Sequence, residues 1–393
     1  MNVIFFETNQ SNLLPLCYTR PVALLRVGIL TILEKWNLRM PADYSFNTEE
    51  YLREKFSFHI DKDNLLLSSH VCPTDELVTE ILKLKTGEGI INKGMPVACR
   101  VNKNDAASYP ESLNNIKWQN FEKELDILCY SWEIPSLSER QFSIDFKLIT
   151  KNKQSEVLDE TNRWCGNKIF IEKGAKVKFA TINASTGPVY IGKNSEIMEG
   201  SLIRGPFALC EHATLNMGTK VYGPVTVGPY SKVGGEISNS VIIGYSNKAH
   251  DGFLGHSVIG EWCNLGAGTN ISNLKNNYEK VKVWNYPLNK FIGTGLQFCG
   301  TIMGDFSRTG IGTTINTGTV IGVGCNLYGA GFPRQFIPSF SIGGAHGYEV
   351  HTLKAVFDLS SKAMMRRNCI FTEHDQRILT VVYDRTAQYR RFK

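Results

Sequence analysis

The side chain with the clearest chemical potential is His250, which opens the run His-Asp-Gly-Phe-Leu-Gly-His. Imidazole titrates near physiological pH, so a histidine can take a proton from a reacting group and return it later. His250 falls between two short sequence repeats, where an outward side chain can face a groove between subunits. The alternative is a histidine that is hydrogen-bonded into the wall of the repeat structure. His256, one repeat unit further along, is expected to take no part in chemistry.

The elements that must position His250 are hexapeptide repeats. Each unit starts with an aliphatic residue, usually followed by Gly, two variable residues, a small residue and a polar one. Such repeats build a parallel β-helix, in which the aliphatic residue points into the core and small residues fit the tight corners. Three units make one coil, so stacked neighbours are expected every eighteen residues. The five clearest copies start at Ile171, Ile191, Val227, Ile259 and Ile321.

Glycine content divides the chain into two kinds of structure. Of the 35 glycines, 30 lie between residues 166 and 344. The first part is typical of a mixed α/β domain, with expected strands at 3–6 and 65–67 and a helix capped by Thr74. A polar linker is expected at 151–163. We therefore predict three parts: an α/β domain at residues 1–160, a β-helix at 165–345 and a helical cap at 346–393.

Two interruptions of the repeat are expected to matter. Residues 272–290 form a polar stretch, and a loop thrown out of a rigid β-helix is a common place for function. The hexapeptide period ends near 331–334. Residues 349–367 and 375–390 are compatible with helices, which we expect to cover the last coil so that it is not an open edge.

Bulk properties exclude several classes of protein. A net charge of +6 over 393 residues is too small to indicate nucleic acid binding. No apolar run is long enough to span a membrane, and the start of the chain has no basic segment typical of a signal peptide. The ten cysteines include no Cys-x-x-Cys pair, so no structural metal site is expected. These features favour a cytoplasmic protein that binds neither nucleic acid nor membrane.

Residues 250–260, together with the run Asn-Leu-Gly-Ala-Gly-Thr that starts at Asn264, resemble a known family. This is the acetyltransferase half of bifunctional bacterial N-acetylglucosamine-1-phosphate uridyltransferase/glucosamine-1-phosphate acetyltransferases. The resemblance covers roughly residues 165–330. It implies a nucleotidyltransferase-like α/β domain joined to a left-handed parallel β-helix that forms a homotrimer. It also implies acetyl-CoA as cosubstrate and a small-molecule sugar phosphate as acceptor.

The resemblance assigns roles to individual residues. His250 would be the base that deprotonates the acceptor amine, and Glu236 would contact it. The remaining assignments are Asn264 and Asn273 for the sugar, Lys232 and Lys248 for its phosphate, and Thr294, Gly312 and Arg334 for acetyl-CoA. Simpler explanations stay open, because repeat corners need small residues anyway and Glu236 and Arg334 can be solvated surface charges.

Three positions depart from the family pattern. Phe253 and Leu274 stand where the family has Tyr, and Glu279 stands where its substrate loop has Lys. Two hydroxyl contacts and one cationic contact are therefore missing. The identity of the acceptor is open on this ground, even if the type of reaction is the same.

The N-terminal part is similar to sugar-phosphate nucleotidyltransferases over residues 14–23, but three of their features are missing. The glycine-rich loop is replaced by residues 7–12, and Val22 stands at the position of a phosphate-binding Lys. The acid that holds magnesium is absent from residues 68–70. Arg20 and Arg26 can still bind a phosphate, or they can be surface or salt-bridged arginines. Mg²⁺ is expected only if this domain is active.

These observations leave three functions open. The first is a trimeric sugar-phosphate N-acetyltransferase that uses acetyl-CoA. The second is an active sugar-1-phosphate nucleotidyltransferase in the first domain. The third is a non-catalytic trimeric scaffold that binds a sugar nucleotide at a decayed site.

Overall fold

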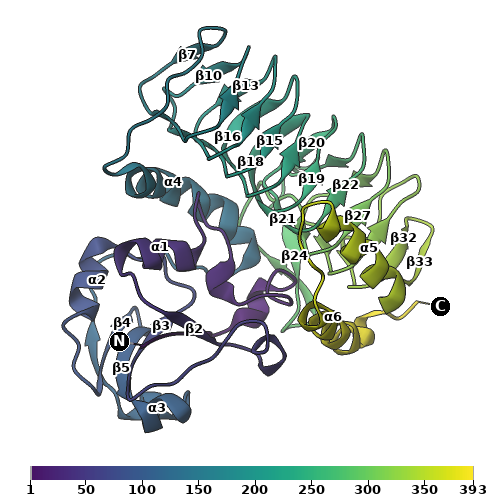
Figure 1. Cartoon of the computed structure of the whole chain (residues 1–393). Coiled ribbons are helices and arrows are strands. Elements are labelled where there is room, and N and C mark those ends of the chain that lie inside the picture. The colour runs from purple at the N-terminus through teal and green to yellow at the C-terminus, as the bar shows by residue number, and fades with distance from the viewer. Residues whose placement is uncertain (1, 393) are drawn as a thin grey trace.

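The computed structural model describes residues 2–392 and shows three parts in chain order (Figure 1). An α/β domain is followed by a long parallel β-helix, and two helices end the described chain, as predicted. The chain leaves the first domain through α4 (Ile134–Thr150) and starts the β-helix at its far end with β7 (Arg163–Cys165). The coils then stack back past the first domain. Within residues 2–392, no helix has the length and apolar character needed to cross a membrane.

The first domain is built on a six-stranded mixed sheet with the order β2-β1-β3-β5-β4-β6. β2, β1 and β3 are parallel, whereas β5 runs antiparallel to β3 and β4. The strands are β1 (Asn2–Phe6), β2 (Tyr44–Asn47), β3 (Asp63–Ser68), β4 (Glu88–Asn92), β5 (Met95–Asn102) and β6 (Lys117–Asn120). The other helices are α1 (Ile32–Arg39), α2 (Asp75–Ile81) and α3 (Lys103–Ala107).

Local sequence signals explain these elements. The two predicted strands correspond to β1 and β3, which are almost wholly buried in the middle of the sheet. The Thr74 hydroxyl accepts a hydrogen bond of 3.1 Å from the amide of Leu77 and so caps α2 as predicted. Thr31 and Glu34 form a reciprocal capping box at the start of α1.

The β-helix consists of strands in two extended sheets, and they are parallel except for β33, which pairs antiparallel with β32. The 10-stranded sheet, which we call the flank sheet, contains β9 (Lys176–Val177), β12 (Glu196–Ile197), β15 (Thr214–Leu215), β17 (Lys232–Val233), β19 (Asn247–Lys248), β22 (Asn264–Leu265), β27 (Arg308–Thr309), β30 (Asn326–Leu327), β32 (Ser341–Gly344) and β33 (Gly347–Val350). The 15-stranded sheet contains β7, β8 (Ile169–Ile171), β10 (Thr181–Asn183), β11 (Val189–Ile191), β13 (Leu202–Arg204), β14 (Phe207–Leu209), β16 (Lys220–Val227), β18 (Glu236–Gly244), β20 (Phe253–Gly255), β21 (Val258–Glu261), β23 (Asn270–Ile271), β26 (Ile302–Met303), β28 (Thr314–Ile315), β29 (Val320–Ile321) and β31 (Phe336–Ile337). Aliphatic side chains stack inside the coils as a separate core, as the repeats predicted.

The polar interruption at 272–290 contributes to a structural element of its own. It leads into the antiparallel hairpin β24 (Lys282–Asn285) and β25 (Lys290–Gly293), which projects from the β-helix toward the first domain. Val283 and Tyr286 are buried in the core shared by the domains, and the Asn285 amide donates to Asn12 at 3.1 Å. Tyr286 also meets Tyr18 edge to face. This stretch therefore docks the two domains together, in addition to the loop role expected from the sequence.

The C-terminal helices are α5 (Leu353–Met365) and α6 (Glu373–Arg385). α5 starts later than the predicted residue 349, because residues 347–350 pair with β32 as β33. Val356 packs near Gly324, the Leu359 carbonyl accepts a hydrogen bond from Arg308, and Arg367 reaches Asn247. α5 thus runs back along the flank sheet across several coils, instead of only covering the last coil as expected.

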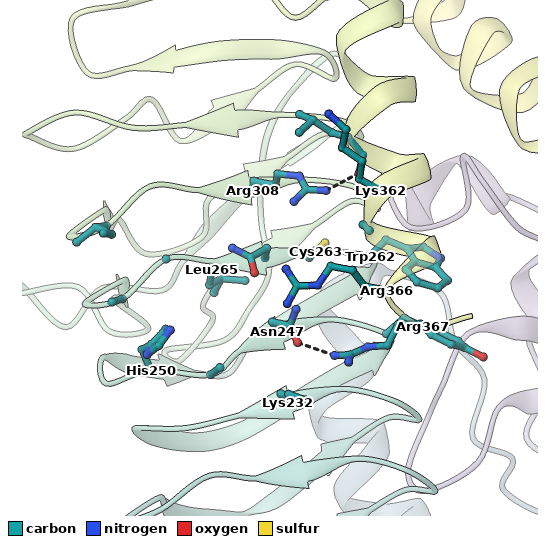
Figure 2. A pocket seen from close by; sticks show the side chains of 18 residues that line it. Lys232, Asn247, His250, Trp262, Cys263, Leu265, Arg308, Lys362, Arg366 and Arg367 are labelled. Atoms are coloured by element: carbon teal, nitrogen blue, oxygen red, sulfur yellow. Dashed lines mark hydrogen bonds between the residues drawn. The ribbon is translucent and has the colours of Figure 1, made fainter. Parts of the chain in front are cut away.

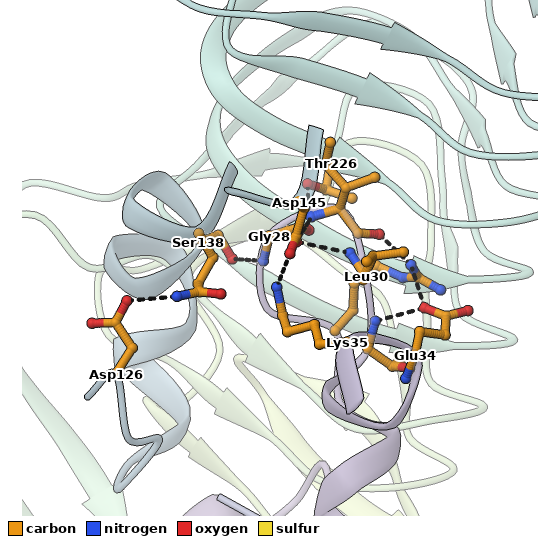
Figure 3. A network of polar contacts seen from close by, with 12 residues as sticks. Gly28, Leu30, Glu34, Lys35, Asp126, Ser138, Asp145 and Thr226 are labelled. Carbon is orange, nitrogen blue, oxygen red and sulfur yellow. Dashed lines mark hydrogen bonds and ion pairs between the residues drawn. The ribbon is translucent and has the colours of Figure 1, made fainter. Parts of the chain in front are cut away.

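Polar contacts join the first domain to the β-helix in two groups, and we call them together the seam. The first group, drawn in Figure 3 around Lys35 and Asp145, includes Arg26, Gly28, Ile29, Leu30, Lys35, Asp145 and Thr226. In the second group, Arg20 meets Glu261 and Asp305. The amides of residues 29 and 30 donate to Asp145, which forms a fully buried ion pair with Lys35. From the β-helix side, Thr226 donates to the Gly28 carbonyl at 2.9 Å. Gly28 has a φ of +86°, and a side chain there would overlap Asp145.

Candidate functional site

A cavity of about 480 Å³ lies between the flank sheet and α5, and we call it the flank pocket (Figure 2). Neighbouring strands align four polar side chains along its sheet side: Lys232, Asn247, Asn264 and Arg308. Each points outward because the next residue of its strand faces the interior of the coil. The repeat geometry therefore turns residues that are far apart in sequence into one continuous column.

His250 lies at the corner that follows β19, and its exposed side chain lines the flank pocket. The strand register places it in a column of corner residues with Met217, Ala267 and Ile311. Its ring makes no hydrogen bond within residues 2–392, and it is open to a ligand. The exposed corner thus argues against a histidine bonded into the wall, and the role of His250 as a base stays a prediction.

The coils around His250 depart from the regular spacing. Leu215 and its stacked partner Val233 are 18 residues apart, whereas Val233 and its partner Lys248 are 15 apart. The shortening is possible because Gly234 packs against the Ala249 carbonyl so closely that any side chain would overlap it. The shortened corner, between Val233 and Glu236, is therefore the one stacked directly beside the corner that carries His250.

Lys248 holds this corner from inside. Its side chain stands in the interior column between Val233 and Leu265 and is only 3% exposed. The ammonium donates to the carbonyls of Gly234, at 3.0 Å, and His250, at 2.6 Å. Burial lowers the pKa of Lys248 to about 8. The ammonium is thus bound to two main-chain carbonyls, and the phosphate contact expected of Lys248 stays a prediction.

The helix side of the flank pocket is cationic. Lys362, Arg366 and Arg367 face the sheet from α5 and the residues directly after it. Arg367 donates to the Asn247 side-chain oxygen at 2.9 Å, and Arg308 donates to the Leu359 carbonyl at 3.2 Å. No Asp or Glu is among the described residues that line the cavity. The pocket is therefore strongly positive.

Two other predicted residues lie on the next face of the coil. Glu236 is half-buried on β18, in register with Phe253, and its carboxylate makes no hydrogen bond within the described chain, to His250 or otherwise. The Asn273 amide donates to Nδ1 of His256 at 2.8 Å, and burial lowers the pKa of His256 to about 4. Neither Glu236 nor Asn273 lines the flank pocket. Asn264 does, and its side-chain amide has no hydrogen-bond partner in residues 2–392.

The residues predicted for acetyl-CoA are not gathered in one place. The Thr294 hydroxyl donates to the Val281 carbonyl at the base of the hairpin, at 2.9 Å. Gly312 follows Ile311, which lines the pocket, and its amide donates to the Ala267 carbonyl at 2.7 Å. Arg334 is exposed near the end of the β-helix. Of these three, only Gly312 lies next to a residue of the pocket.

Both arginines predicted as phosphate contacts belong to the seam. Arg20 is 6% exposed and pairs with Glu261 at 2.8 Å and with Asp305. Arg26 is equally buried and donates to the Ile243 carbonyl at 3.3 Å. These contacts favour the salt-bridged alternative stated for them.

Sequence reasoning missed four cations of the pocket: Arg308, Lys362, Arg366 and Arg367. The hairpin insertion hides Arg308, because it stacks on Asn264 although 44 residues separate them. The three C-terminal cations can be recognised in the sequence as the basic end of an amphipathic helix. That signal did not show which surface the helix covers.

Comparisons with known proteins agree with this architecture. Residues 3–154 match the family described as sugar nucleotidyl transferase. A bifunctional sugar-1-phosphate nucleotidylyltransferase/acetyltransferase from Sulfurisphaera tokodaii is 36% identical over 178 residues, which cover 43% of this chain and 42% of that protein. The bifunctional protein GlmU of Baumannia cicadellinicola is 30% identical over 167 residues, 42% of this chain and 33% of its own. These matches confirm the resemblance, and they span less than half the length of either relative.

Among solved structures, UDP-N-acetylglucosamine acyltransferase from Campylobacter jejuni aligns with 60% of this chain and 96% of its own. The sequence identity is 14% and the TM-score is 0.31.

Proposed function

We propose that the protein is a sugar-phosphate N-acetyltransferase that uses acetyl-CoA and a glucosamine-1-phosphate-like acceptor. The observation that carries this proposal is the exposed His250 at the mouth of a cationic pocket that also presents the free Asn264 amide. The resemblance at 250–260 supports the type of reaction, and so does the relative that is named a nucleotidylyltransferase/acetyltransferase. The sugar nucleotidyl transferase-like domain is then a fused partner of the acetyltransferase.

The chemistry needs a base beside the acceptor amine, because a protonated amine has no lone pair. His250 takes the proton as the nitrogen attacks the thioester carbonyl and the carbon–nitrogen bond forms. The tetrahedral intermediate collapses, the carbon–sulfur bond breaks, and the thiolate of CoA receives the proton from the imidazolium. Asn264 would hydrogen-bond the sugar and Lys232 would attract its phosphate. Glu236, Asn273, Thr294, Gly312 and Arg334 keep the roles that the resemblance implies for them.

We further propose that the site functions in a homotrimer. Met217 is 68% exposed and Ile311 is 85% exposed in the same corner column as His250. Apolar side chains this exposed, in a row beside a candidate catalytic group, favour a surface that another copy covers. A second subunit would also enclose the open side of the His250 corner.

The test is an assay of acetyl transfer from acetyl-CoA to glucosamine-1-phosphate, in which release of the free thiol of CoA is measured. We expect His250→Ala to lower the rate of transfer by about 10²–10⁴-fold. His346→Ala is the matched control, since His346 is exposed and lies outside the flank pocket, and it should keep most of the activity. Wild-type rates in the His250→Ala variant would refute the mechanism.

A second function, nucleotidyl transfer by the first domain, is favoured by the family match of residues 3–154. At the end of β1, where a nucleotide site is expected in this domain, the protein's own side chains and main chain bind one another. Glu7, directly after β1, accepts hydrogen bonds from the Val22 amide at 2.6 Å and the Thr48 hydroxyl at 2.5 Å. Residues 68–70 after β3 offer no carboxylate and do not fit Mg²⁺. Release of pyrophosphate from a nucleoside triphosphate, a sugar phosphate and Mg²⁺ would support this function, and ligand binding without any turnover would support a scaffold instead.

A further inference from the structure

The charges of the flank pocket are not balanced by the protein itself. Arg308, Lys362, Arg366 and Arg367 converge on one cavity from two elements, and no carboxylate lies among the described lining residues. We propose that these four cations form a subsite for a pyrophosphate group, or two neighbouring phosphates, of a small-molecule ligand. This subsite deepens the proposed function and rests on it for its role in the reaction, but ligand binding can be measured without turnover.

The contrast between Arg308 and Arg20 supports the subsite. Arg20 pairs with two carboxylates, those of Glu261 and Asp305. Arg308 has no carboxylate partner in residues 2–392, and this is the difference between them, because the Nε atoms of both arginines are buried without a hydrogen-bond partner. Burial also lowers the pKa of the Arg308 guanidinium. A half-buried guanidinium with an unmet donor is costly, so an anion in the pocket would relieve a penalty that the protein otherwise carries.

The helix dipole does not account for the cluster. Cations near a helix C-terminus are stabilised by it, and Lys362 and Arg366 lie at the end of α5. The dipole is equivalent to about half an elementary charge, however, and four cations exceed it several-fold. Arg367 binds only a neutral amide, and its pKa is lowered by burial and by neighbouring Arg366. A net positive charge therefore remains for a ligand.

The shape and chemistry of the pocket favour phosphate groups. Guanidinium groups match phosphate oxygens in a bidentate manner, and this pocket holds three of them. The aromatic rings in the lining offer little stacking surface to a base, because Tyr245 and Trp262 stack on each other with centroids 4.4 Å apart. Trp262 is covered by Phe306 on its other side. The ligand would therefore be held here by its charge.

The decisive variant is the double substitution Lys362→Gln/Arg366→Gln. Neither side chain makes a hydrogen bond or ion pair within the described chain, so the fold should tolerate the change. Lys354→Gln is the matched control, since Lys354 is an exposed lysine on the same helix outside the pocket. Inorganic pyrophosphate, titrated calorimetrically into the full chain at low ionic strength, should bind the wild type and the control equally. The double variant should bind at least about tenfold more weakly.

Two results would overturn the proposal: no binding of pyrophosphate by the wild type, or equal binding by the double variant. The second result would place the anion elsewhere, for example in the first domain. Titrations with CoA and with a nucleoside diphosphate sugar distinguish the source of the phosphates. Loss of affinity for either one in the double variant supports the subsite and identifies its ligand, and loss for neither overturns it.

His250→Ala separates this proposal from the proposed function. The variant keeps all four cations, so it should bind pyrophosphate like the wild type while losing acetyl transfer. If His250→Ala transfers acetyl groups normally and the double variant still loses binding, the reaction is wrong and the subsite stands. If His250→Ala is inactive and the double variant binds normally, the reaction stands and the subsite is wrong.

Discussion

The seam and the flank pocket differ in the partners of their cations. In the seam, Lys35 pairs with Asp145, and Arg20 pairs with Glu261 and Asp305. In the flank pocket the cations meet only neutral partners or none. Both regions lie on the outside of the same β-helix, and α4 and α5 bring charged or polar groups to them. The cations of the seam thus have carboxylate partners, whereas no carboxylate lies among the described residues that line the flank pocket.

Because of this difference, we expect the seam residues to determine the stability of the fold and the pocket residues to determine ligand binding. A buried pair whose partner is removed leaves a charge without compensation, so seam residues should affect folding strongly. A cation that has no partner in the protein contributes little to folding and can interact fully with a ligand. Substitutions in the two regions should therefore change different measured quantities.

The largest effect is expected in the seam, for Asp145→Asn. The amide has nearly the same shape, but it leaves Lys35 without a counter-charge and cannot accept every hydrogen bond that the carboxylate receives. We expect the free energy of unfolding in urea to fall by about 3–5 kcal/mol. Glu80→Gln, which breaks the exposed pair with Lys83, should change it by less than about 1 kcal/mol. Equal losses in the two variants would contradict the role given to the seam.

The sequence predicts the coils better than it predicts what lies against them. Hexapeptide spacing is local, so it reveals the β-helix, the exposed His250 corner and the outward direction of Asn264. The pairing of Arg20 with Asp305 joins residues 285 positions apart, and no periodicity marks it. Likewise, the amphipathic pattern of α5 predicts a helix with a buried face. It does not indicate that Arg367 will reach Asn247, because docking depends on the shape of both surfaces.

Lys248 is an intermediate case, a buried cation held by carbonyls alone, and its effect should depend on pH. Its pKa of about 8 in the folded protein is below the usual value, so between about pH 8 and 10 the unfolded chain binds more protons. This group therefore makes the wild type gain stability as pH rises through that window. The substitution Lys248→Met keeps a long unbranched side chain at this position but removes the group that titrates.

Urea titrations of both proteins at several pH values between 7.5 and 9.5 measure this effect. The difference in unfolding free energy, wild type minus Lys248→Met, should rise by roughly 1 kcal/mol per pH unit above pH 8. Comparing the two proteins cancels the contributions of the buried tyrosines and cysteines, which also titrate at high pH. Parallel pH profiles would show that burial does not lower the pKa of Lys248 in the folded protein.

The smallest effect is expected in the flank pocket itself, for Arg366→Gln without ligand. The side chain makes no hydrogen bond or ion pair in residues 2–392, and its attraction to the end of α5 is opposed by repulsion from Arg367. The free energy of unfolding should stay within about 0.5 kcal/mol of the wild type, as for Lys354→Gln. A loss above about 1 kcal/mol would mean that Arg366 stabilises the fold, as the seam residues do. The positive charge of the pocket would then have a structural cause, and the contrast with the seam would fail.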